Sequence, residues 1–296
     1  MPSISDATLP LMAGDDLAPG LYLVATPIGN LEDITLRAIR VLKQSDLIAC
    51  EDTRQTQKLL NHYGILTPTI SYHEHNEASR AAELVEKLAQ GARIAVVSDA
   101  GVPGVSDPGF RLVSLAIERA IPVVPIPGGA AFVSALVASG LPVDSFSFHG
   151  FLPAKSGARR QELGKIKDSS TTDIFYEAPH RISGTLEDIF SMLGASRRVV
   201  IARELTKIHE EFLRGTAGEF LDIVKNRAEV KGEITLLIGP AEKGTAESGS
   251  VSIPDRVEQI MRDEKMDEKA ALKKIAKERG ISKSEAYREW QLRPKR

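Results

Sequence analysis

The sequence predicts an α/β protein with two α/β domains and a small helical extension. Apolar, β-rich runs alternate with helical periods along the first half of the chain, and more strand candidates follow a break at Gly140–Asp144. The polar, small-residue stretch Gly239–Pro254 is typical of a linker and sets the last segment apart. A length of 296 residues fits this division, because cores tend to split beyond roughly 250 residues.

These observations divide the chain into five expected segments. They are a flexible N-terminal tail (1–19), an N-terminal α/β domain with a mostly parallel sheet (20–143), a mixed α/β domain (144–240), a linker (241–253) and a basic, helix-turn-helix-like extension (254–296).

The first domain has a regular alternation of strands and helices. Four apolar runs are predicted strands: Leu21–Thr26, Leu47–Cys50, Arg93–Ser98 and Pro122–Ile126. Between the first two, apolar residues recur at helical spacing, which predicts a helix over Asp33–Gln44 with Asp33 or Thr35 as its N-cap. Such alternation is typical of a parallel sheet covered by helices on both faces.

The second domain has strand candidates with fewer helices between them. They are Phe146–Phe151, Thr172–Tyr176, Arg198–Ala202, Glu211–Arg214 and Glu233–Ile238. This pattern is consistent with a mixed sheet.

The extension is expected to form three short helices. Its apolar residues fall into three sets: Val257, Ile260 and Met261; Leu272, Ile275 and Ala276; Ala286, Tyr287 and Trp290. Gly280 at one helix end and Ser282 as the next N-cap give a helix-turn-helix pattern. Residues 269–296 hold ten Lys or Arg against three Glu, a charge of +7, so a total of −2 leaves −9 on the remainder. A polyanionic partner and a merely solvated basic face both fit this charge.

Composition also limits the cellular setting. Cys50 is the single cysteine, which excludes an internal disulfide and suits a reducing compartment. No stretch approaches the roughly 20 apolar residues of a membrane span. We therefore expect a cytoplasmic protein with no membrane partner.

Gly- and Pro-rich segments follow the predicted strands of the first domain. They are ATPIGNLED, EDTRQT, SDAGVPGVSDPG and PIPGGAA. The carboxyl ends of parallel strands share one edge of a sheet, so these segments together predict a ligand pocket there. Each one alone also fits ordinary turn chemistry.

The same segments lack the signals of phosphate binding. Only Gly29 stands where a G-x-G-x-x-G fingerprint would follow the first strand, and there is no Walker pattern. This disfavours NAD, FAD and ATP and favours a ligand with ribose hydroxyls and no phosphates. Asp99 can accept hydrogen bonds from such hydroxyls or cap a turn. Small residues would let a flat ring approach the backbone: Ala100, Gly101, Ala130 and Ala131.

Six motifs, in order over about residues 20–240, carry a family resemblance: LYLVATPIGNLEDITLRAIRVLKQSDLIACEDTRQTQKLL, SDAGVPGVSDPG, IPGGAAFVSALVASGLP, GFLPAK, YEAPHRI and RELTKIHEE. They resemble the RNA-directed branch of the tetrapyrrole methylase superfamily, the small-subunit ribosomal RNA methyltransferases. The resemblance implies S-adenosylmethionine as cofactor and 2′-O-methylation of a cytidine in the decoding region of 16S rRNA. It also implies 16S rRNA within the small ribosomal subunit as partner, and a homodimer. The first loop, TPIGN, has fewer glycines than is common in the superfamily, which puts a tetrapyrrole substrate in doubt.

The resemblance further implies a cofactor site between the two domains. The first domain would contribute Ile28, Val97, Ser98, Asp99, Val102, Ala130 and Ala131. From the second domain, Glu177, Thr206, Ile234 and Thr235 would close over the cofactor.

Methyl transfer to a ribose hydroxyl requires positioned reactants and a base or cation to manage the hydroxyl proton. The candidates are Glu51, Glu177 and Lys155, although Glu177 can equally form a structural ion pair with Arg181. His73 and His75 are spaced as on one side of a strand, but no further His or Cys set accompanies them, so no metal is expected.

RNA affinity comes largely from cations on the phosphate backbone. The expected phosphate contacts are Arg54, Lys155, Arg159, Arg160 and Arg181 in the domains, and Lys273, Lys274, Lys277, Lys283 and Arg288 in the extension. Alternatively, the extension packs on the catalytic domains or on a second subunit. Two other functions are a small-molecule C/N-methylase of the tetrapyrrole type and a non-catalytic RNA- or DNA-binding protein. The +7 extension counts against the first, and the retained cofactor loops count against the second.

Overall fold

The computed structural model describes residues 16–225, 231–241, 253–278 and 281–291. The chain divides into two compact units, Met1–Ala241 and Glu242–Arg296. Within these residues, the first unit contains two five-stranded sheets and the second contains three helices, so the predicted α/β class with a helical extension is confirmed. The predicted tail and linker lie largely outside the described residues, and Gly280 lies outside them.

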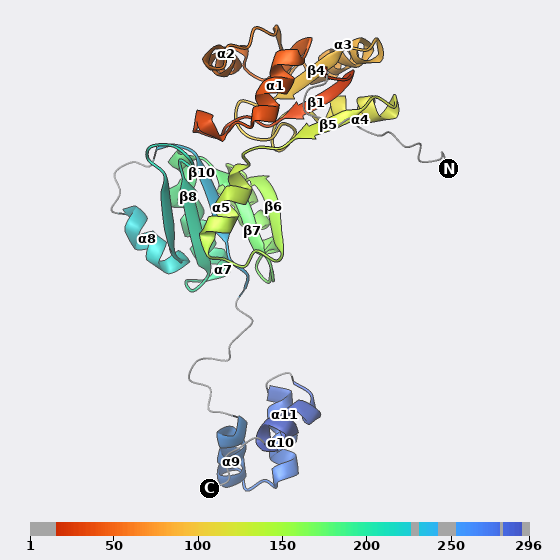
Figure 1. The fold of residues 1–296 in the computed structure, drawn as a ribbon. Coiled ribbons are helices and arrows are strands. Elements are labelled where there is room, and N and C mark those ends of the chain that lie inside the picture. The colour runs from red at the N-terminus through yellow and green to blue at the C-terminus, as the bar shows by residue number, and fades with distance from the viewer. Residues whose placement is uncertain (1–15, 226–230, 242–252, 279–280, 292–296) are drawn as a thin grey trace. The chain divides into compact units, whose positions relative to one another are not determined.

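The first sheet is entirely parallel, with strand order β3-β2-β4-β1-β5 (Figure 1). Its strands are β1 (Gly20–Val24), β2 (Leu47–Cys50), β3 (Thr69–Ser71), β4 (Arg93–Val97) and β5 (Val123–Ile126). Four of them match the predicted runs to within two residues. Strand β3 was not predicted. It ends at Ser71, so His73 and His75 lie in the turn that leads to the next helix, and the strand spacing inferred for them is wrong.

Helices cover both faces of the first sheet. The α1 (Leu36–Gln44) and α2 (Thr53–His62) helices pack on one face, and α3 (Glu77–Ala89) and α4 (Phe110–Glu118) pack on the other. Side chains along each strand alternate between the two cores, as the pleat requires. Tyr22 and Val24 face α1, whereas Leu21 faces α3 and α4.

The first predicted helix starts later than expected. Thr35 is its N-cap, because the Thr35 Oγ1 accepts a hydrogen bond from the Ala38 amide at 3.0 Å. Leu31–Asp33 form a separate 3₁₀ turn capped by Asn30. Asp33 therefore precedes the helix instead of beginning it.

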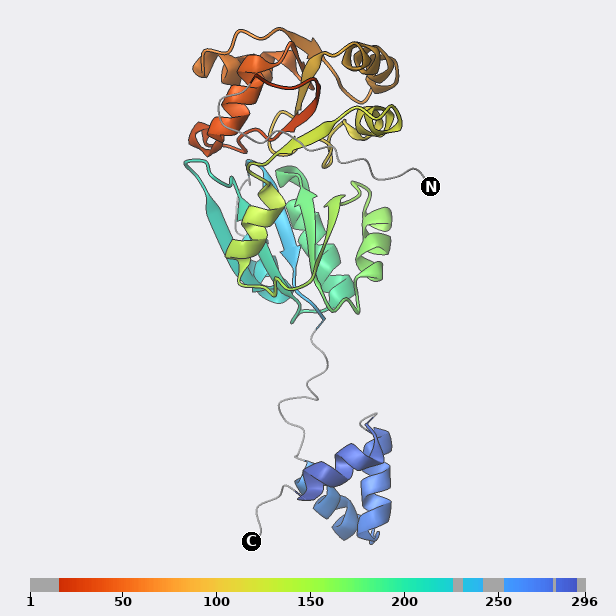
Figure 2. The same cartoon turned by 45° about the vertical axis from the view of Figure 1, so that its right-hand side comes forward.

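The second sheet is mixed, with strand order β6-β7-β10-β8-β9 (Figure 2). Only the β6–β7 pair is parallel. The strands are β6 (Phe146–Phe151), β7 (Thr172–Glu177), β8 (Arg198–Arg203), β9 (Glu211–Thr216) and β10 (Ile234–Ile238). All of them overlap predicted strands.

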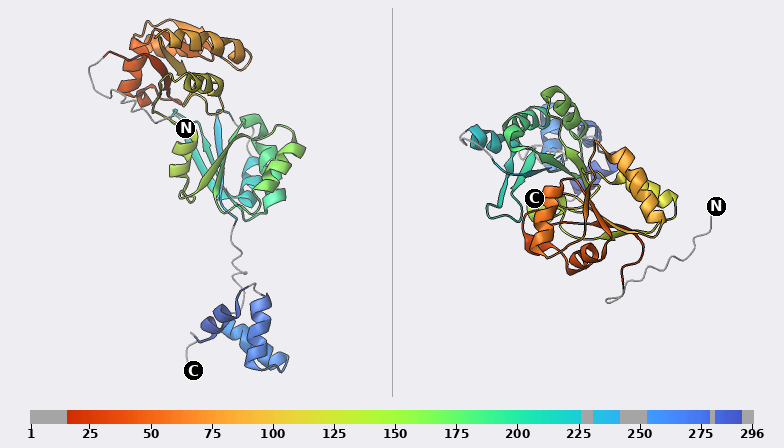
Figure 3. Two further views of the ribbon diagram at one scale, coloured as in Figure 1. Left: turned by 90° about the vertical axis from the view of Figure 1, so that its right-hand side faces the viewer. Right: turned by 90° about the horizontal axis from the view of Figure 1, so that it is seen from above.

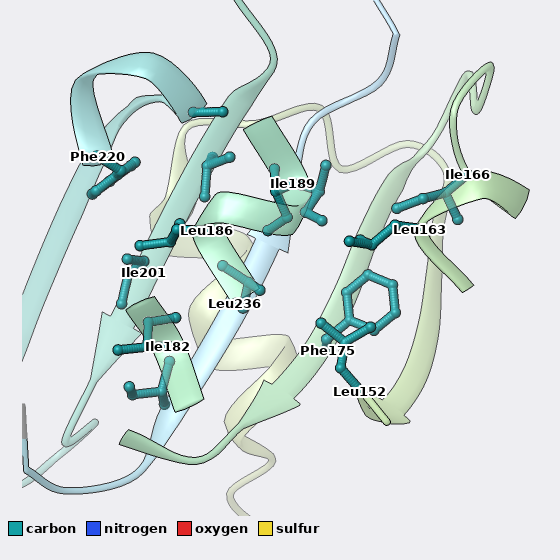
Figure 4. Close-up of a cluster of buried hydrophobic side chains, with 14 residues drawn as sticks. Leu152, Leu163, Ile166, Phe175, Ile182, Leu186, Ile189, Ile201, Phe220 and Leu236 are labelled. Carbon is teal, nitrogen blue, oxygen red and sulfur yellow. The ribbon is translucent and has the colours of Figure 1, made fainter. Parts of the chain in front are cut away.

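Both faces of the second sheet are buried as well. On one face, α6 (Ser156–Lys165), α7 (Ile182–Leu193) and α8 (Ala217–Lys225) cover a core that includes Leu186 and Phe175 (Figure 4). A short 3₁₀ turn, Pro179–Arg181, leads into α7. The α5 helix (Ala131–Ser139) covers the other face, against β7, β8 and β10. The chain therefore passes from the first sheet to the layer of the second before α5, at about Pro127–Ala130. The domain boundary between residues 143 and 144 stays a prediction.

The connections of the first sheet define a point where the chain changes direction. The helices after β1 and β2 lie on one face, and those after β3 and β4 lie on the other. Strands β1 and β4 are neighbours, so the segments that leave them diverge to opposite faces. Such a topological switch point opens a crevice at the carboxyl ends of the two strands, where ligands bind in α/β proteins.

The second unit consists of α9 (Ile253–Asp263), α10 (Glu268–Glu278) and α11 (Lys283–Gln291) (Figure 3). Val257, Ile275 and Trp290 are among the residues of its buried core. As predicted, Ser282 is the N-cap of α11, because its Oγ accepts a hydrogen bond from the Glu285 amide at 3.2 Å. Tyr287, predicted as a core residue, is 49% exposed. No helix in the described part of the chain is long and apolar enough to cross a membrane.

Candidate active site

The first unit contains a cavity of 390 Å³ at the carboxyl edge of the first sheet. The loops after β1, β4 and β5 line one side of it. The ends of β6, β7 and β8 and the segment that leads into β10 line the other. The lining residues are Ile28, Asp99–Val102, Val105–Asp107, Ala130–Phe132, Phe151, Tyr176–Pro179, Ala202, Leu205 and residues 232–235. The predicted pocket edge and the topological switch point therefore coincide.

An isolated bridge joins the loops after β1 and β4. The Thr26 amide donates to the Gly101 carbonyl at 2.8 Å, and the Gly101 amide donates to the Thr26 carbonyl at 3.1 Å. The Thr26 hydroxyl donates to the Ser98 carbonyl at 3.1 Å. Gly101 has φ of +86°, a conformation that side chains disfavour, so glycine suits this position.

Two further contacts fix the rim of the cavity. The Asp52 amide donates to the Asp99 Oδ1 at 3.1 Å, which ties the loop after β2 to the loop after β4. The Asn30 amide donates to the Thr206 Oγ1 at 3.0 Å. A Cβ at Gly29 would lie 2.5 Å from the Lys207 Cγ, so the hairpin between β8 and β9 packs directly on the first loop.

Most residues expected at the cofactor site line this cavity. They are Ile28, Asp99, Val102, Ala130, Ala131, Glu177, Ile234 and Thr235. Val97, Ser98 and Thr206 do not line it. Val97 is buried against α1 and α2, and the Ser98 Oγ donates within its own turn, to the Gly101 carbonyl at 3.2 Å. Thr206 acts on the cavity indirectly, through Asn30.

The charge of the lining is one-sided. Asp99, Asp107, Glu177 and Glu233 contribute carboxyl groups, and none of the described residues that line the cavity is Lys or Arg. Glu177 and Glu233 form ion pairs with Arg181 and Lys207. The carboxylates of Asp99 and Asp107 therefore carry the charge that opposes a phosphate and favours a cationic ligand.

Glu177 is fully enclosed by donors. Its Oε1 accepts from the Arg181 guanidinium at 2.8 Å and from the Ala178 amide at 2.7 Å, and its Oε2 accepts from the Thr185 hydroxyl at 2.6 Å. The side chain is 0% exposed. Glu177 therefore forms the ion pair with Arg181, one of the two roles expected for it, and its part in catalysis stays a prediction.

A different group has the properties of a base. Burial, together with the charges of Glu51 and Asp99, raises the pKa of Asp107 to about 6. Burial and the Asp99 carboxylate also raise the pKa of Glu51, but Glu51 does not line the cavity. Asp107 does line it. Asp107 was absent from the predicted site, because its burial depends on how the loop after β4 folds.

An aromatic wall formed by α5 and the second sheet was also not predicted. Phe132 stacks on Phe148 with ring centroids 4.5 Å apart, and Tyr176 contacts Phe148 and Phe151 at 5.0 and 5.4 Å. Phe132, Phe151 and Tyr176 line the cavity. The alternation Phe146–Phe148 in a predicted strand was a usable signal, because residues two apart lie on one face of a sheet.

The expected phosphate contacts in the first unit differ in exposure. Lys155 and Arg160 are exposed at the start of α6, and the Arg54 side chain is 87% exposed beside Asp52. Arg159 is buried, and its Nε donates to the Asp188 Oδ2 at 2.8 Å. Arg181 is largely buried against Glu177. A phosphate contact from Arg159 or Arg181 would require the side chain to leave its carboxylate. Lys155 does not line the cavity.

No group of three or more His, Cys, Asp or Glu placed to hold a metal ion occurs in the described ranges. His73 and His75 have ring centroids 6.0 Å apart.

Comparison with known proteins identifies the class. The sequence model of the tetrapyrrole (corrin/porphyrin) methylases matches residues 20–221. The structure is similar to uroporphyrin-III C-methyltransferase from Thermus thermophilus complexed with S-adenyl homocysteine. The TM-score is 0.52 at 18% identity, covering 74% of this chain and 97% of that chain. The fold is thus the tetrapyrrole methylase fold.

Proteins of similar sequence define a smaller group within the tetrapyrrole methylases. The ribosomal RNA small subunit methyltransferase I of Halalkalibacterium halodurans is 51% identical over 271 residues, which cover 90% of this chain and 93% of the relative. That of Vibrio cholerae serotype O1 is 51% identical over 239 residues, 80% of this chain and 82% of the relative. The chain belongs to the tetrapyrrole methylase family and, within it, to the group of these small subunit methyltransferases, so the resemblance predicted from its motifs is confirmed.

The raised pKa of Asp107 predicts a pH-dependent effect of Asp107→Asn on stability. The folded state holds this proton more tightly than the unfolded state, so wild-type stability falls as pH rises from the ordinary pKa of 3.8 to about 6. We expect the variant to gain in urea midpoint over wild type across this window and to keep a constant advantage above it. The exposed control Asp144→Asn should show no such trend. An Asp107→Asn difference that does not vary with pH would contradict the burial of this carboxyl group.

Proposed function

We propose that this chain is an S-adenosylmethionine-dependent methyltransferase that acts on the RNA of the small ribosomal subunit. The observation that carries the proposal is the cavity at the switch point, which has carboxylates, small residues and aromatic rings but no cation in its described lining. The names of the group's members supply the substrate class.

The residues present fit this ligand. Asp99 Oδ2 is available to accept from ribose hydroxyls, because the hydrogen bond from Asp52 uses Oδ1. Ala130 and Ala131 let a flat ring approach the backbone, and Tyr176 and Phe132 offer faces for stacking. The acidic lining would stabilise a sulfonium charge. When bound, S-adenosylmethionine supplies a methyl group on a cationic sulfur.

The remaining chemical task for this chain is to remove the proton of the acceptor hydroxyl. Bound S-adenosylmethionine would supply the methyl group and leave as a neutral sulfide, and the proton of the 2′-hydroxyl would have to pass to a base of this chain. Asp107 is the best-placed carboxyl group for that step, because it lines the cavity and its pKa of about 6 leaves it ionised at neutral pH yet basic enough to accept a proton. Glu177 is engaged by three donors, and neither Glu51 nor Lys155 lines the cavity.

The proposal includes the finer features that the family resemblance implies. The acceptor is the ribose 2′-hydroxyl of a cytidine in the decoding region of 16S rRNA, and the enzyme acts in the cytoplasm as a homodimer. The buried, unpaired Cys50 suits a reducing compartment.

Substitution of Gly101 tests the cofactor site. Gly101→Ala places a Cβ at φ of +86° and 3.4 Å from the Ile28 Cγ2, so the bridge to Thr26 must shift. We expect affinity for S-adenosylmethionine, measured by calorimetry, to fall by at least about tenfold, the equivalent of a ~1.4 kcal/mol rearrangement. Gly91→Ala is the matched control, with φ of +91° and open space around it. Equal affinity in the two variants would remove the bridge from the binding site.

Mapping the transferred methyl group tests the substrate. Purified protein, small ribosomal subunits that lack the modification and isotopically labelled S-adenosylmethionine should give one labelled nucleotide in 16S rRNA, located by mass spectrometry. We expect a 2′-O-methylcytidine in the decoding region. A label on a base or on a small tetrapyrrole instead of RNA would refute the assignment.

Asp107→Asn tests the base. We expect kcat to fall by about 10²- to 10⁴-fold with the affinity for S-adenosylmethionine largely kept, because a general base contributes about that much. In wild type, kcat should rise with pH and level off above about 6, as the carboxyl group ionises. Asp144→Asn should retain the wild-type rate and profile. A variant that keeps the wild-type rate would exclude Asp107 from proton transfer.

A further inference from the structure

The second unit has a groove between α10 and α11, which we call the α10–α11 groove. It is lined by Lys269, Leu272, Lys273, Lys283, Ser284 and Tyr287, and its volume is 640 Å³. That volume lies within the range of roughly 300–1,000 Å³ found for ligand sites. Both helices contribute cations, so the positive charge flanks the groove on two sides.

The groove cations are available for a ligand. Lys269, Lys273 and Lys283 are exposed and form no ion pair with any described residue. By contrast, the Lys274 Nζ lies 2.6 Å from the Glu264 Oε2, so this cation is already neutralised. Of the residues predicted to contact phosphate in the extension, Lys273 and Lys283 line the groove. Lys274 is instead paired with Glu264.

Tyr287 gives the groove an aromatic surface. Its neighbour Ala286 is buried in the core, whereas Tyr287 is 49% exposed. A tyrosine ring that is this exposed offers a large apolar face to a ligand. Leu272, 5% exposed, contributes an apolar residue to the same groove. A stacking face among cations is the combination that binds single-stranded nucleic acid.

A capping box fixes the start of α11. Glu285 caps the helix, since its Oε2 accepts from the Ser282 amide at 2.9 Å, and the Glu285 amide donates to the Ser282 Oγ at 3.2 Å. This capping box engages Glu285 with the backbone and leaves Lys283 and Ser284 exposed at the helix start. The remaining exposed groups in the groove are suited to phosphates and to one base face.

We propose that the α10–α11 groove binds a single-stranded RNA segment, with Lys269, Lys273 and Lys283 on its phosphates and a base stacked on Tyr287. The choice of RNA over DNA rests on the proposed function, whereas the single-stranded mode rests on the groove alone.

Fluorescence anisotropy of the full chain with a labelled single-stranded RNA oligonucleotide tests the stacking residue. Tyr287→Ala should weaken binding by roughly 5- to 150-fold, the range for losing one base–aromatic stack. Tyr287→Phe should bind like wild type, because the ring is kept. Circular dichroism of each variant controls for folding of the helices. Equal affinity of Tyr287→Ala and wild type, or tighter binding of duplex DNA than of single-stranded RNA, would overturn the proposal.

The salt dependence of the same assay tests the cations. Lys273→Gln and Lys283→Gln should each lower the slope of log affinity against log salt by about 0.7, the value for one single-strand phosphate contact. Lys274→Gln is the matched control and should leave the slope unchanged, because Lys274 is paired with Glu264. An equal loss in all three variants would mean diffuse attraction and no defined groove.

Calorimetry with S-adenosylmethionine separates this inference from the proposed function. Tyr287→Ala should bind S-adenosylmethionine like wild type. Tyr287-dependent RNA binding without any methyl transfer would defeat the proposed function and leave the groove in place. Methyl transfer together with RNA binding that does not depend on Tyr287 would defeat the groove proposal and leave the proposed function in place.

Discussion

The backbone bridge between Thr26 and Gly101 is the constraint on which the cavity depends. Strands β1 and β4 are neighbours, yet the segments that follow them leave toward opposite faces of the sheet. Without a link, two diverging loops would each have to order alone, and each ordered residue costs about 1–2 kcal/mol of backbone entropy. Two reciprocal backbone hydrogen bonds and the Thr26 hydroxyl hold the loops together where they begin to separate. Ile28 and Asp99, which follow β1 and β4, are thereby fixed in the lining of one cavity.

The acidic lining has an energetic cost that the proposed ligand would offset. Burial raises the pKa of Asp107 and of Glu51, and the negative charge of Asp99 raises both further, so the ionised forms of these two groups destabilise the empty cavity. A sulfonium cation would relieve this repulsion. The product of transfer is a neutral sulfide, which loses that attraction. The same charges thus favour the methyl donor over the spent product, a difference that binding through the shared adenosine portion cannot provide.

Much of the fold could be predicted because buried strands have continuous runs of apolar residues in the sequence. Leu47–Cys50 and Arg93–Val97 were predicted almost residue for residue, whereas Thr69–Ser71 is a short, half-buried edge strand with little apolar content. The edge that carries the site was also predictable, because parallel strands share it. The aromatic wall, the burial of Arg159 and the exposure of Tyr287 were not. Each of these features depends on which elements pack together. Helical spacing predicts the face of a helix on which a residue lies, but it does not predict which element packs against that face.

The two proposed ligands make opposite electrostatic demands on one chain. A cationic methyl donor requires a cavity with negative charge, and the same charge repels the phosphates of RNA. The described lining of the cavity accordingly has no Lys or Arg, and the exposed Arg54 and Arg160 lie outside it. The strongest positive charge, +7 in residues 269–296, belongs to a different folded unit. Placing the two charge signs in separately folded units lets each region keep the sign that its ligand needs.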